Sequence, residues 1–480
     1  MKENNIRNSV VGSLFWKFGE RVASQGVSFI ISMILARLLM PEDYGTIALV
    51  TVFINLAAVF INSGFATALI QKKDADSVDF STMFYCSLIC SVLIYLLLYA
   101  VAPWVAEFYS IPELKQILRV FALQVPLSAY NSIQTAYVSR HMMFQKVFVS
   151  SVIVAVGSGV IGIAMAYAGF GVWALVFQTM LATVISTVVL SFLIPWKLEW
   201  KFSKTSAVSM MKYGSRVLGA DLSGTFFGEV RSLIIGRVYT SADLAFYNKG
   251  QQLPTLITSN LSTTLISVMF PAMANFSDDL VQVKSMAKRS MRILSYVLVP
   301  CLFGLAAVME PLVIVLFTEK WIPTIRYAQV LSFGLCIGVF GIIPVQILKA
   351  IGRSDVVLNL EIYKKPVYVL LLVIGVSIDV FALAVAMAVY DVYGVFVNML
   401  QMKKQIGYTM KEQLLDLMPA FLLGTGMMLT VLLIPSFGSM MATLIVKIAA
   451  GIVFYVGMSA VFKVESFYYL LDMVRSVIRK

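Results

Sequence analysis

Charged and polar side chains recur at helical spacing in the first apolar segment of the 480-residue chain. They are Lys17, Glu20, Arg21, Ser24 and Ser28, which follow i, i+3, i+4, i+7 and i+11 and would share one arc of a helix. A charge near the middle of a bilayer costs about 3 kcal/mol on insertion scales, so such residues usually face a partner or a hydrated cavity. We therefore expect this arc to line a cavity.

A second segment, residues 213–236, has the same character. Its charged and small residues are Arg216, Asp221, Gly224, Gly228, Glu229, Arg231 and Ser232. Most of them fall on one helical face, and the segment is otherwise apolar. Arginine presents a planar fork that suits phosphate, so the two arginines favour an anionic ligand in the predicted cavity.

A third charged group, Glu361, Lys364 and Lys365, precedes Pro366 in the segment 356–377. A proline inside a helix frees a backbone carbonyl and produces a kink. The two lysines would form a basic rim on the cavity, or they would extend along the helix to the membrane surface. The predicted substrate-binding residues are thus Lys17, Glu20, Arg21, Arg216, Asp221, Arg231, Lys364 and Lys365.

Three further polar stripes leave two interpretations open. They comprise Gln124, Ser128, Asn131 and Thr135; Asn55 and Asn62; and Gln252, Thr255, Ser259, Ser262 and Thr263. Each stripe suits a hydrated cavity, but each also suits hydrogen bonds between helices, worth about 0.6 kcal/mol apiece.

The composition shows which solvent these helices meet. The chain is 60% hydrophobic and 13% charged, with a mean hydropathy of +0.88, whereas a soluble domain is about 45–50% apolar and about 25% charged. Four cysteines, all in apolar segments, predict packing rather than disulfides. His141 is the only histidine, which excludes a histidine metal cluster or a Ser-His-Asp triad. We expect no metal, no cofactor and no enzymatic activity.

Apolar runs of membrane-spanning length predict an all-α polytopic protein with about 14 transmembrane helices. The predicted spans are 14–39, 45–70, 81–102, 116–138, 147–168, 172–194, 213–236, 254–275, 291–316, 326–349, 356–377, 379–400, 414–434 and 440–462. Lysine and arginine concentrate in the alternate loops that share a side with both termini, so both ends are predicted to be cytoplasmic. This topology and attraction to anionic membrane lipids explain the net charge of +12 without nucleic acid.

An internal repeat sets the predicted domains. Residues 34–45 align without gaps on 234–245, with Arg37 on Arg237 and Asp43 on Asp243, and residues 171–175 resemble 379–383. Spans one to six would therefore repeat as seven to twelve, giving two parallel six-helix bundles around a central cavity plus two appended helices. The predicted domains are 1–200, 201–413, 414–462 and an amphipathic cytoplasmic tail, 463–480.

Several short motifs together resemble the polysaccharide transporter family of the multidrug/oligosaccharidyl-lipid/polysaccharide exporter superfamily. They are residues 35–39 with 41–45, then 245–249, 270–272 and 316–321. The resemblance implies a flippase that moves undecaprenyl-pyrophosphate-linked oligosaccharide to the outer leaflet of the cytoplasmic membrane. It further implies that charged residues of the first and seventh helices line the cavity.

The resemblance also implies a lipid-linked oligosaccharide substrate from O-antigen, capsule, exopolysaccharide or teichuronic-type synthesis. A proton or sodium ion could couple to transport, with Asp221, Glu229, Asp379 and Asp391 as the candidate coupling residues. A glycan polymerase and glycosyltransferases could be partners. The competing functions are a multidrug/cation antiporter of the same superfamily and a membrane glycan polymerase. The first usually has an acidic lobe and twelve helices, and the second usually has a large catalytic loop that this sequence lacks.

Overall fold

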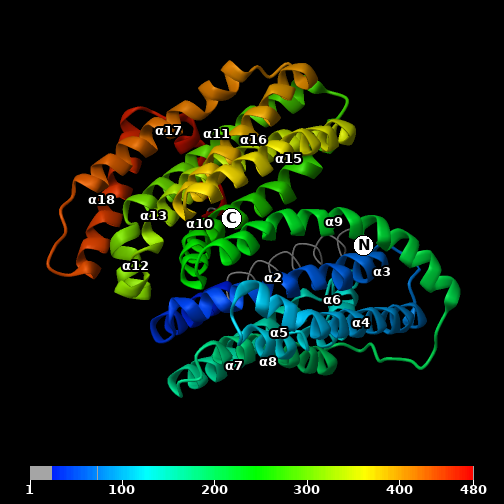
Figure 1. Cartoon of the computed structure of the whole chain (residues 1–480). Coiled ribbons are helices and arrows are strands. Elements are labelled where there is room, and N and C mark those ends of the chain that lie inside the picture. The colour runs from blue at the N-terminus through cyan, green and yellow to red at the C-terminus, as the bar shows by residue number, and fades with distance from the viewer. Residues whose placement is uncertain (1–23, 73, 479–480) are drawn as a thin grey trace. The chain divides into compact units, whose positions relative to one another are not determined.

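A computed structural model describes residues 24–72 and 74–478, which form helices and connecting loops (Figure 1). The chain folds into two compact units, and the boundary between them follows Ala245. The first contains a helix at residues 24–38, followed by α2 (Pro41–Ile61), π-helix η1 (Asn62–Ala66), α3 (Thr67–Gln71), α4 (Ser77–Tyr109), α5 (Leu114–Phe121), α6 (Gln124–Arg140), α7 (Phe144–Tyr167), α8 (Val172–Leu193) and α9 (Lys204–Val238).

Helix α10 (Ser241–Ala274) begins in the first unit and continues into the second. The second unit then contains α11 (Leu280–Ala307), α12 (Met309–Phe317), the 3₁₀ turn η2 (Glu319–Trp321), α13 (Thr324–Phe340), α14 (Ile342–Ala350), α15 (Ser354–Ile378), α16 (Val380–Ile406), α17 (Met410–Leu433), α18 (Met440–Val461) and α19 (Glu465–Ile478).

Nine helical spans in the described ranges are long and apolar enough to cross a membrane. They are α2, α4, α7, α8, α11, the continuous α13–α14 stretch, α16, α17 and α18. The remaining predicted spans are also helical where the structure describes them. However, they are shorter or more polar, as the charges at Glu361 and Lys364 in α15 illustrate. The count of fourteen therefore stays a prediction.

The two segments aligned by the repeat have matching local structure. One helix ends at residue 38 and the next begins at Pro41, whereas α9 ends at Val238 and α10 begins at Ser241. Asp43 accepts a hydrogen bond from the Met40 N–H at 3.0 Å, and Asp243 accepts one from the Thr240 N–H at 3.2 Å. Each aspartate therefore satisfies a backbone donor that precedes its own helix. This correspondence supports the predicted repeat.

Helix α9 packs within the first unit. The Asn55 amide of α2 donates to the Glu229 carboxylate at 2.7 Å, and the Tyr109 hydroxyl of α4 donates to the Leu233 carbonyl at 3.3 Å. A Cβ at Gly236 would lie 2.3 Å from Leu49, so glycine permits this close approach. The described chain thus divides into two packed units after Ala245. The predicted domain boundary at residue 200 comes from the internal repeat instead. The predicted domains remain an expectation.

The polar stripe of α6 joins that helix to α8. Gln124 donates to Thr183 at 3.1 Å, and Asn131 donates to Ser186 at 2.8 Å. Gln134, outside the predicted stripe, donates to Ser191 at 2.8 Å. Hydrogen bonding between helices therefore accounts for Gln124 and Asn131, because half-buried amides in an apolar surrounding need such partners.

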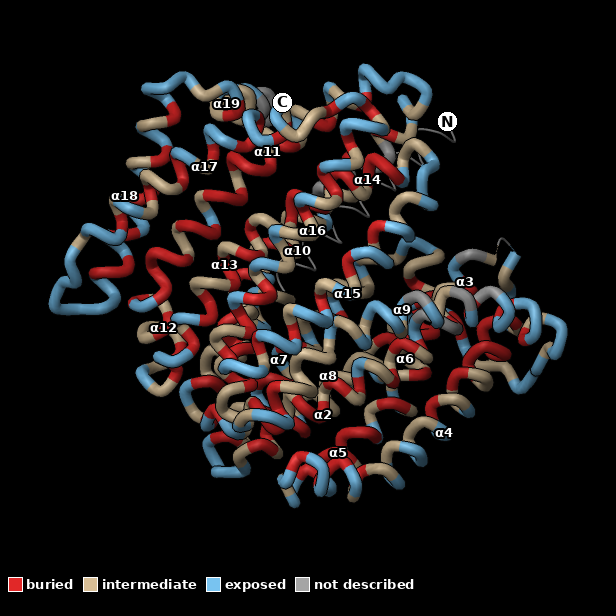
Figure 2. Tube along the Cα trace, turned by 45° about the horizontal axis from the view of Figure 1, so that its top comes forward, coloured by how far each residue is buried: buried red, intermediate tan, exposed pale blue. Residues whose placement is uncertain are grey.

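Ion pairs join α11, α17 and α19 in the second unit. Lys284 and Lys288 contact Glu412 at 3.0 and 2.9 Å, while Arg292 contacts Asp416 at 2.7 Å and Glu465 at 2.6 Å. Aromatic and aliphatic residues of α19, including Phe467 and Leu470, pack against the buried core of this unit. Figure 2 shows the buried residues in red.

Candidate functional site

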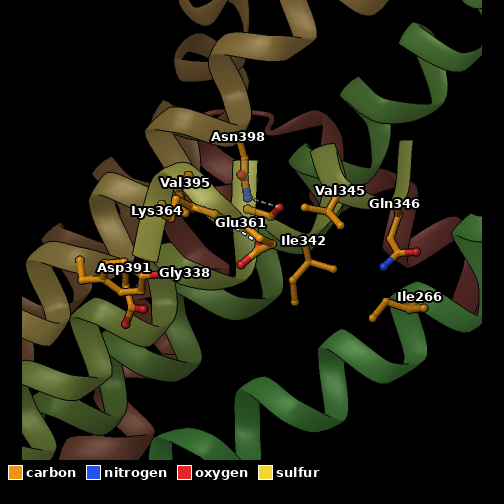
Figure 3. Close-up of a pocket in the computed structure, with 13 residues that line it drawn as sticks. Ile266, Gly338, Ile342, Val345, Gln346, Glu361, Lys364, Asp391, Val395 and Asn398 are labelled. Atoms are coloured by element: carbon orange, nitrogen blue, oxygen red, sulfur yellow. Dashed lines mark hydrogen bonds and ion pairs between the residues drawn. The ribbon is translucent and has the colours of Figure 1, made fainter. Parts of the chain in front are cut away.

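A polar pocket of about 310 Å³ lies within the second unit, between α10, α13, α14, α15 and α16 (Figure 3). Its polar side chains are Gln346, Glu361, Lys364, Tyr390, Asp391 and Asn398. Three glycines also line it, namely Gly338 on α13, Gly341 between α13 and α14, and Gly394 on α16. The helices that hold these residues are otherwise apolar, so the pocket concentrates polarity that the rest of the unit avoids.

The break between α13 and α14 forms one wall. Pro344 lies in the first turn of α14, where its missing N–H cannot continue the hydrogen bonding of α13. Gly341 stands at the break, and its carbonyl accepts a hydrogen bond from the Asn398 amide at 3.1 Å. The Asn398 side-chain oxygen is buried and has no protein hydrogen-bond partner in the described structure. The break therefore positions an acceptor that a ligand hydroxyl or a cation could use.

Helix α15 supplies an ion pair to the opposite wall. The Lys364 ammonium lies 2.5 Å from the Glu361 carboxylate, three residues earlier on the same helix. The Lys364 side chain is only 8% exposed, whereas that of Glu361 is 46% exposed. A Cβ at Gly394 would lie 3.8 Å from the Lys364 chain, so the lysine passes close to α16. Burial of the ammonium requires the carboxylate beside it.

Helix α16 supplies the second carboxylate. A Cβ built on Gly338 would lie 3.5 Å from Asp391, and one built on Gly334 would lie 2.7 Å from the Ala388 backbone. These glycines let α13 approach α16 closely. The rings of Tyr390 and of Tyr368 on α15 meet edge to face, with centroids 5.1 Å apart. The pair of tyrosines packs α15 against α16 beside the charged groups.

Two carboxylates and one ammonium line this pocket, which gives a net formal charge of −1. Carboxylates, an amide oxygen and a tyrosine suit hydrogen bonds from a polyhydroxylated ligand. The described residues contain no group of three or more His, Cys, Asp or Glu side chains that could hold a metal. The net negative charge of the pocket repels a phosphate, and Lys364 is already paired with Glu361, so the pocket favours hydroxyl groups over phosphate.

A second polar pocket, of about 370 Å³, lies within the first unit between the 24–38 helix, α7 and α8. Its polar residues are Ser24, Ser28, Ser151, Ser158, Gln178, Thr179 and Ser186. It has no charged side chain among its described lining residues. Ser158 donates to the Val154 carbonyl at 2.7 Å, and Thr179 donates to the Leu175 carbonyl at 2.9 Å. Their own helices therefore already satisfy these hydroxyl donors.

The structure places the predicted site residues in several environments. Lys17, Glu20 and Arg21 lie outside the described residues, while Ser24 and Ser28 of the same arc line the pocket of the first unit. On α9, Asp221 is exposed and Arg231 is half-buried, and Arg216 belongs to the same helix. Lys364 lines the pocket of the second unit.

Sequence reasoning missed part of this second site. The structure brings Asn398 and Gln346 to the same pocket as Lys364. Asp391, which the sequence marks only as a candidate for ion coupling, also lines this pocket. Lys365 is half-buried and does not line the pocket. A polar residue in an apolar helix marks Asn398 as unusual, but nothing in the local sequence indicates its contact with Gly341.

Comparisons with known proteins agree with this architecture. The chain is 22% identical over 313 residues to the succinoglycan biosynthesis transport protein ExoT of Rhizobium meliloti (strain 1021), a match that covers 65% of this chain and 63% of ExoT. It is 19% identical over 385 residues to the lipopolysaccharide biosynthesis protein WzxC of Escherichia coli (strain K12), covering 77% of this chain and 76% of WzxC. The chain thus spans a little under two thirds of ExoT.

A solved structure gives the same fold. The lipid II flippase MurJ, in an inward closed conformation, superposes with a TM-score of 0.74 at 13% identity, covering 94% of this chain and 98% of MurJ. The fold and the apolar spans define a polytopic α-helical membrane protein, as predicted. The family model described as polysaccharide biosynthesis protein matches residues 34–326. The chain belongs to that family.

Proposed function

We propose that this protein is a flippase that moves a lipid-linked oligosaccharide from the cytoplasmic to the outer leaflet of the cytoplasmic membrane. Family membership over residues 34–326 is the observation that carries the proposal. The transport and polysaccharide biosynthesis roles in the names of ExoT and WzxC support it. The polar pockets within an apolar helical protein add physical support, because a hydrated sugar needs polar groups to cross hydrocarbon.

The physical problem that such a flippase solves has two parts. The oligosaccharide and pyrophosphate cannot enter hydrocarbon unaided, whereas the polyprenyl tail gains nothing by leaving it. A protein can therefore shield the head group while the tail remains in lipid. The carboxylates and the free acceptor of Asn398 are suited to sugar hydroxyls. We assign the pyrophosphate to Lys17, Arg21, Arg216 and Arg231 of the first and seventh predicted spans, because arginine can bind phosphate with two parallel hydrogen bonds.

The proposed cycle is alternating access without bond cleavage. Two parallel bundles would rock about the bound head group, with both termini in the cytoplasm. A proton or sodium ion is the proposed coupling ion, and the glycosyltransferases and polymerase that make and use the substrate are the proposed partners. The second candidate is a multidrug/cation antiporter of the same superfamily, which the net negative charge of the unit-two pocket would suit.

Depletion of the protein tests the proposal. We expect surface glycan to decrease and lipid-linked oligosaccharide to accumulate in the inner leaflet, where a membrane-impermeant probe added outside cannot reach it. Accumulation of single repeat units that the outside probe does reach would instead favour a polymerase. Unchanged glycan with increased sensitivity to cationic drugs would favour the antiporter.

A further inference from the structure

An apolar groove of about 770 Å³ lies on the second unit between α13, α16 and α17. Phe340, Val392, Phe396, Leu414, Met418 and Phe421 are among the residues that line it, and we call it the α16–α17 groove. Its volume is within the range of about 300–1,000 Å³ that small-molecule sites occupy. The groove is therefore large enough to hold a ligand rather than a single solvent molecule.

The walls of the α16–α17 groove are apolar and open. Phe396 is 52% exposed, Leu414 is 56% exposed and Met418 is 47% exposed. Helices α16 and α17 both qualify as membrane spans, so these side chains face hydrocarbon. In a bilayer, the acyl chain of a lipid would therefore fill such a groove. An acyl chain and the groove walls are both apolar, so no polar group loses water when the chain binds.

One end of the groove is basic. Lys411 is the only charged residue that lines it, and Leu414, Leu415 and Met418 follow Lys411 at i+3, i+4 and i+7 on the same face of α17. Lys403 stands one turn beyond Met399 on the corresponding face of α16. Both lysines are exposed, and no ion pair or side-chain hydrogen bond involves either of them within residues 24–72 and 74–478. Their charges are therefore available to an anion.

A second groove, of about 660 Å³, provides an internal comparison. It lies between α11, α17, α18 and α19 and also has apolar walls, including Leu422, Phe454 and Phe462. Its basic residue, Arg292, already contacts Asp416 and Glu465. The charged residues of this groove therefore carry a net formal charge of −1, whereas the α16–α17 groove carries +1. Only the latter favours an anionic head group.

We propose that the α16–α17 groove binds an anionic phospholipid of the surrounding bilayer. Its acyl chain would lie along Phe396, Leu414 and Met418, and its phosphate would contact Lys411 and Lys403. The positive-inside distribution places these lysines at the cytoplasmic leaflet, where anionic lipids attract basic residues. The site is separate from the polar pocket, because the groove uses Val392, Phe396 and Met399 of α16, whereas the pocket uses Asp391, Gly394 and Asn398.

The separation of these two faces favours a bilayer phospholipid over the substrate. A substrate tail bound here would lie beside its head-group pocket but on a different face of α16, with only Val395 shared. A phospholipid needs nothing more than an apolar channel ending at unpaired cations. The proposal does not depend on the proposed transport activity.

Native mass spectrometry of the purified full chain, with phosphatidylglycerol or phosphatidylcholine and without polyprenyl lipid, tests this site. We expect the parent to retain phosphatidylglycerol in preference to phosphatidylcholine. A lysine near an anionic lipid surface contributes about fivefold in affinity, so Lys403→Gln with Lys411→Gln should weaken phosphatidylglycerol binding by about 25-fold. Lys463→Gln is the matched control, since Lys463 is exposed and lies beside the second groove. It should leave binding unchanged.

A second variant tests the apolar wall. Leu414→Trp should fill the groove and decrease retention of both lipids, without affecting the charged end. The proposal is wrong if Lys463→Gln weakens binding as much as Lys411→Gln does alone, because each removes one charge and bulk charge would then suffice. It is also wrong if equimolar polyprenyl phosphate displaces phosphatidylglycerol, or if the parent is a dimer that Leu414→Trp dissociates. The first result would assign the groove to the substrate tail, and the second to another copy of the chain.

Discussion

The two polar pockets occupy helix pairs that correspond in the predicted repeat but differ in chemistry. In the first unit, α7 and α8 surround serine, threonine and glutamine side chains, and hydroxyls such as Ser158 donate to their own helix backbone. In the second unit, α15 and α16 surround two carboxylates, a lysine and a buried amide. The hydroxyl groups of the first pocket keep their hydrogen bonds whether or not a ligand is present. The buried lysine of the second pocket, in contrast, is stable only while its ion pair with Glu361 is intact. The second pocket is therefore where substitutions should have the larger effect.

The same two helix pairs also differ in how closely they pack. A Cβ on Gly157 of α7 would lie 3.2 Å from the Cδ1 end of the Ile185 side chain of α8. A Cβ on Gly375 of α15 would lie 2.6 Å from the Leu383 backbone of α16. A side chain can rotate away, but a backbone atom moves only with its helix. At these two positions, an added methyl group therefore disturbs the second pair more than the first.

Glu361→Gln should have the largest effect. It leaves the Lys364 ammonium buried without its carboxylate, and removal of one partner from a fully buried pair costs about 3–5 kcal/mol. Because Glu361 is 46% exposed, we expect a smaller loss, about 2 kcal/mol in the free energy of unfolding. Thermal unfolding in detergent measures stability, and transport per molecule of inserted protein measures function.

The double variant Glu361→Gln with Lys364→Met separates charge from folding. Removal of both partners of a buried pair is often neutral for stability, so we expect unfolding close to that of the parent. Transport should stay low, because the pocket loses its charged pair. Parental transport by the double variant would show that the pair is only structural.

Substitution of one glycine in each helix pair should give the next largest difference in stability. Gly375→Ala forces α15 away from the Leu383 backbone, and overpacking of this kind costs about 1–3 kcal/mol. Gly157→Ala displaces only the Cδ1 end of the Ile185 side chain and gains about 1 kcal/mol of helix propensity, so its net effect should be small. Parallel thermal unfolding of the two variants measures the difference. Equal losses would mean that the two helix pairs are equally tolerant.

Substitution of the asparagines Asn131 and Asn398 should have the smallest effect on stability. Asn131→Ala removes a hydrogen bond to Ser186 that joins α6 to α8, a contact worth about 0.6 kcal/mol. Asn398→Ala removes a buried bond to Gly341 and also the acceptor in the pocket, so it should cost about 1 kcal/mol and additionally weaken transport. If both variants transport equally well, Asn398 serves packing alone.

Sequence periodicity predicts much of the fold, because membrane helices must satisfy every backbone hydrogen bond internally and present apolar surfaces. It also identifies Lys364 and Glu361, since charges in an apolar segment are conspicuous. It does not predict that Lys364 lies beside Asp391 and Asn398. That arrangement depends on long-range packing of α13 and α15 against α16 and on glycines such as Gly338, whose role emerges only from the neighbouring helix.

Reconstitution is the most direct measurement of the central claim. Purified protein in vesicles, with fluorescent lipid-linked oligosaccharide in the inner leaflet, should expose that lipid to a sugar-cleaving enzyme added outside. A charged hydrogen bond is worth about 1.5–3 kcal/mol, so the variant with both Glu361→Gln and Lys364→Met should be about ten- to a hundredfold slower per inserted molecule. Exposure at the same rate in protein-free vesicles and in vesicles with the parent would contradict the account.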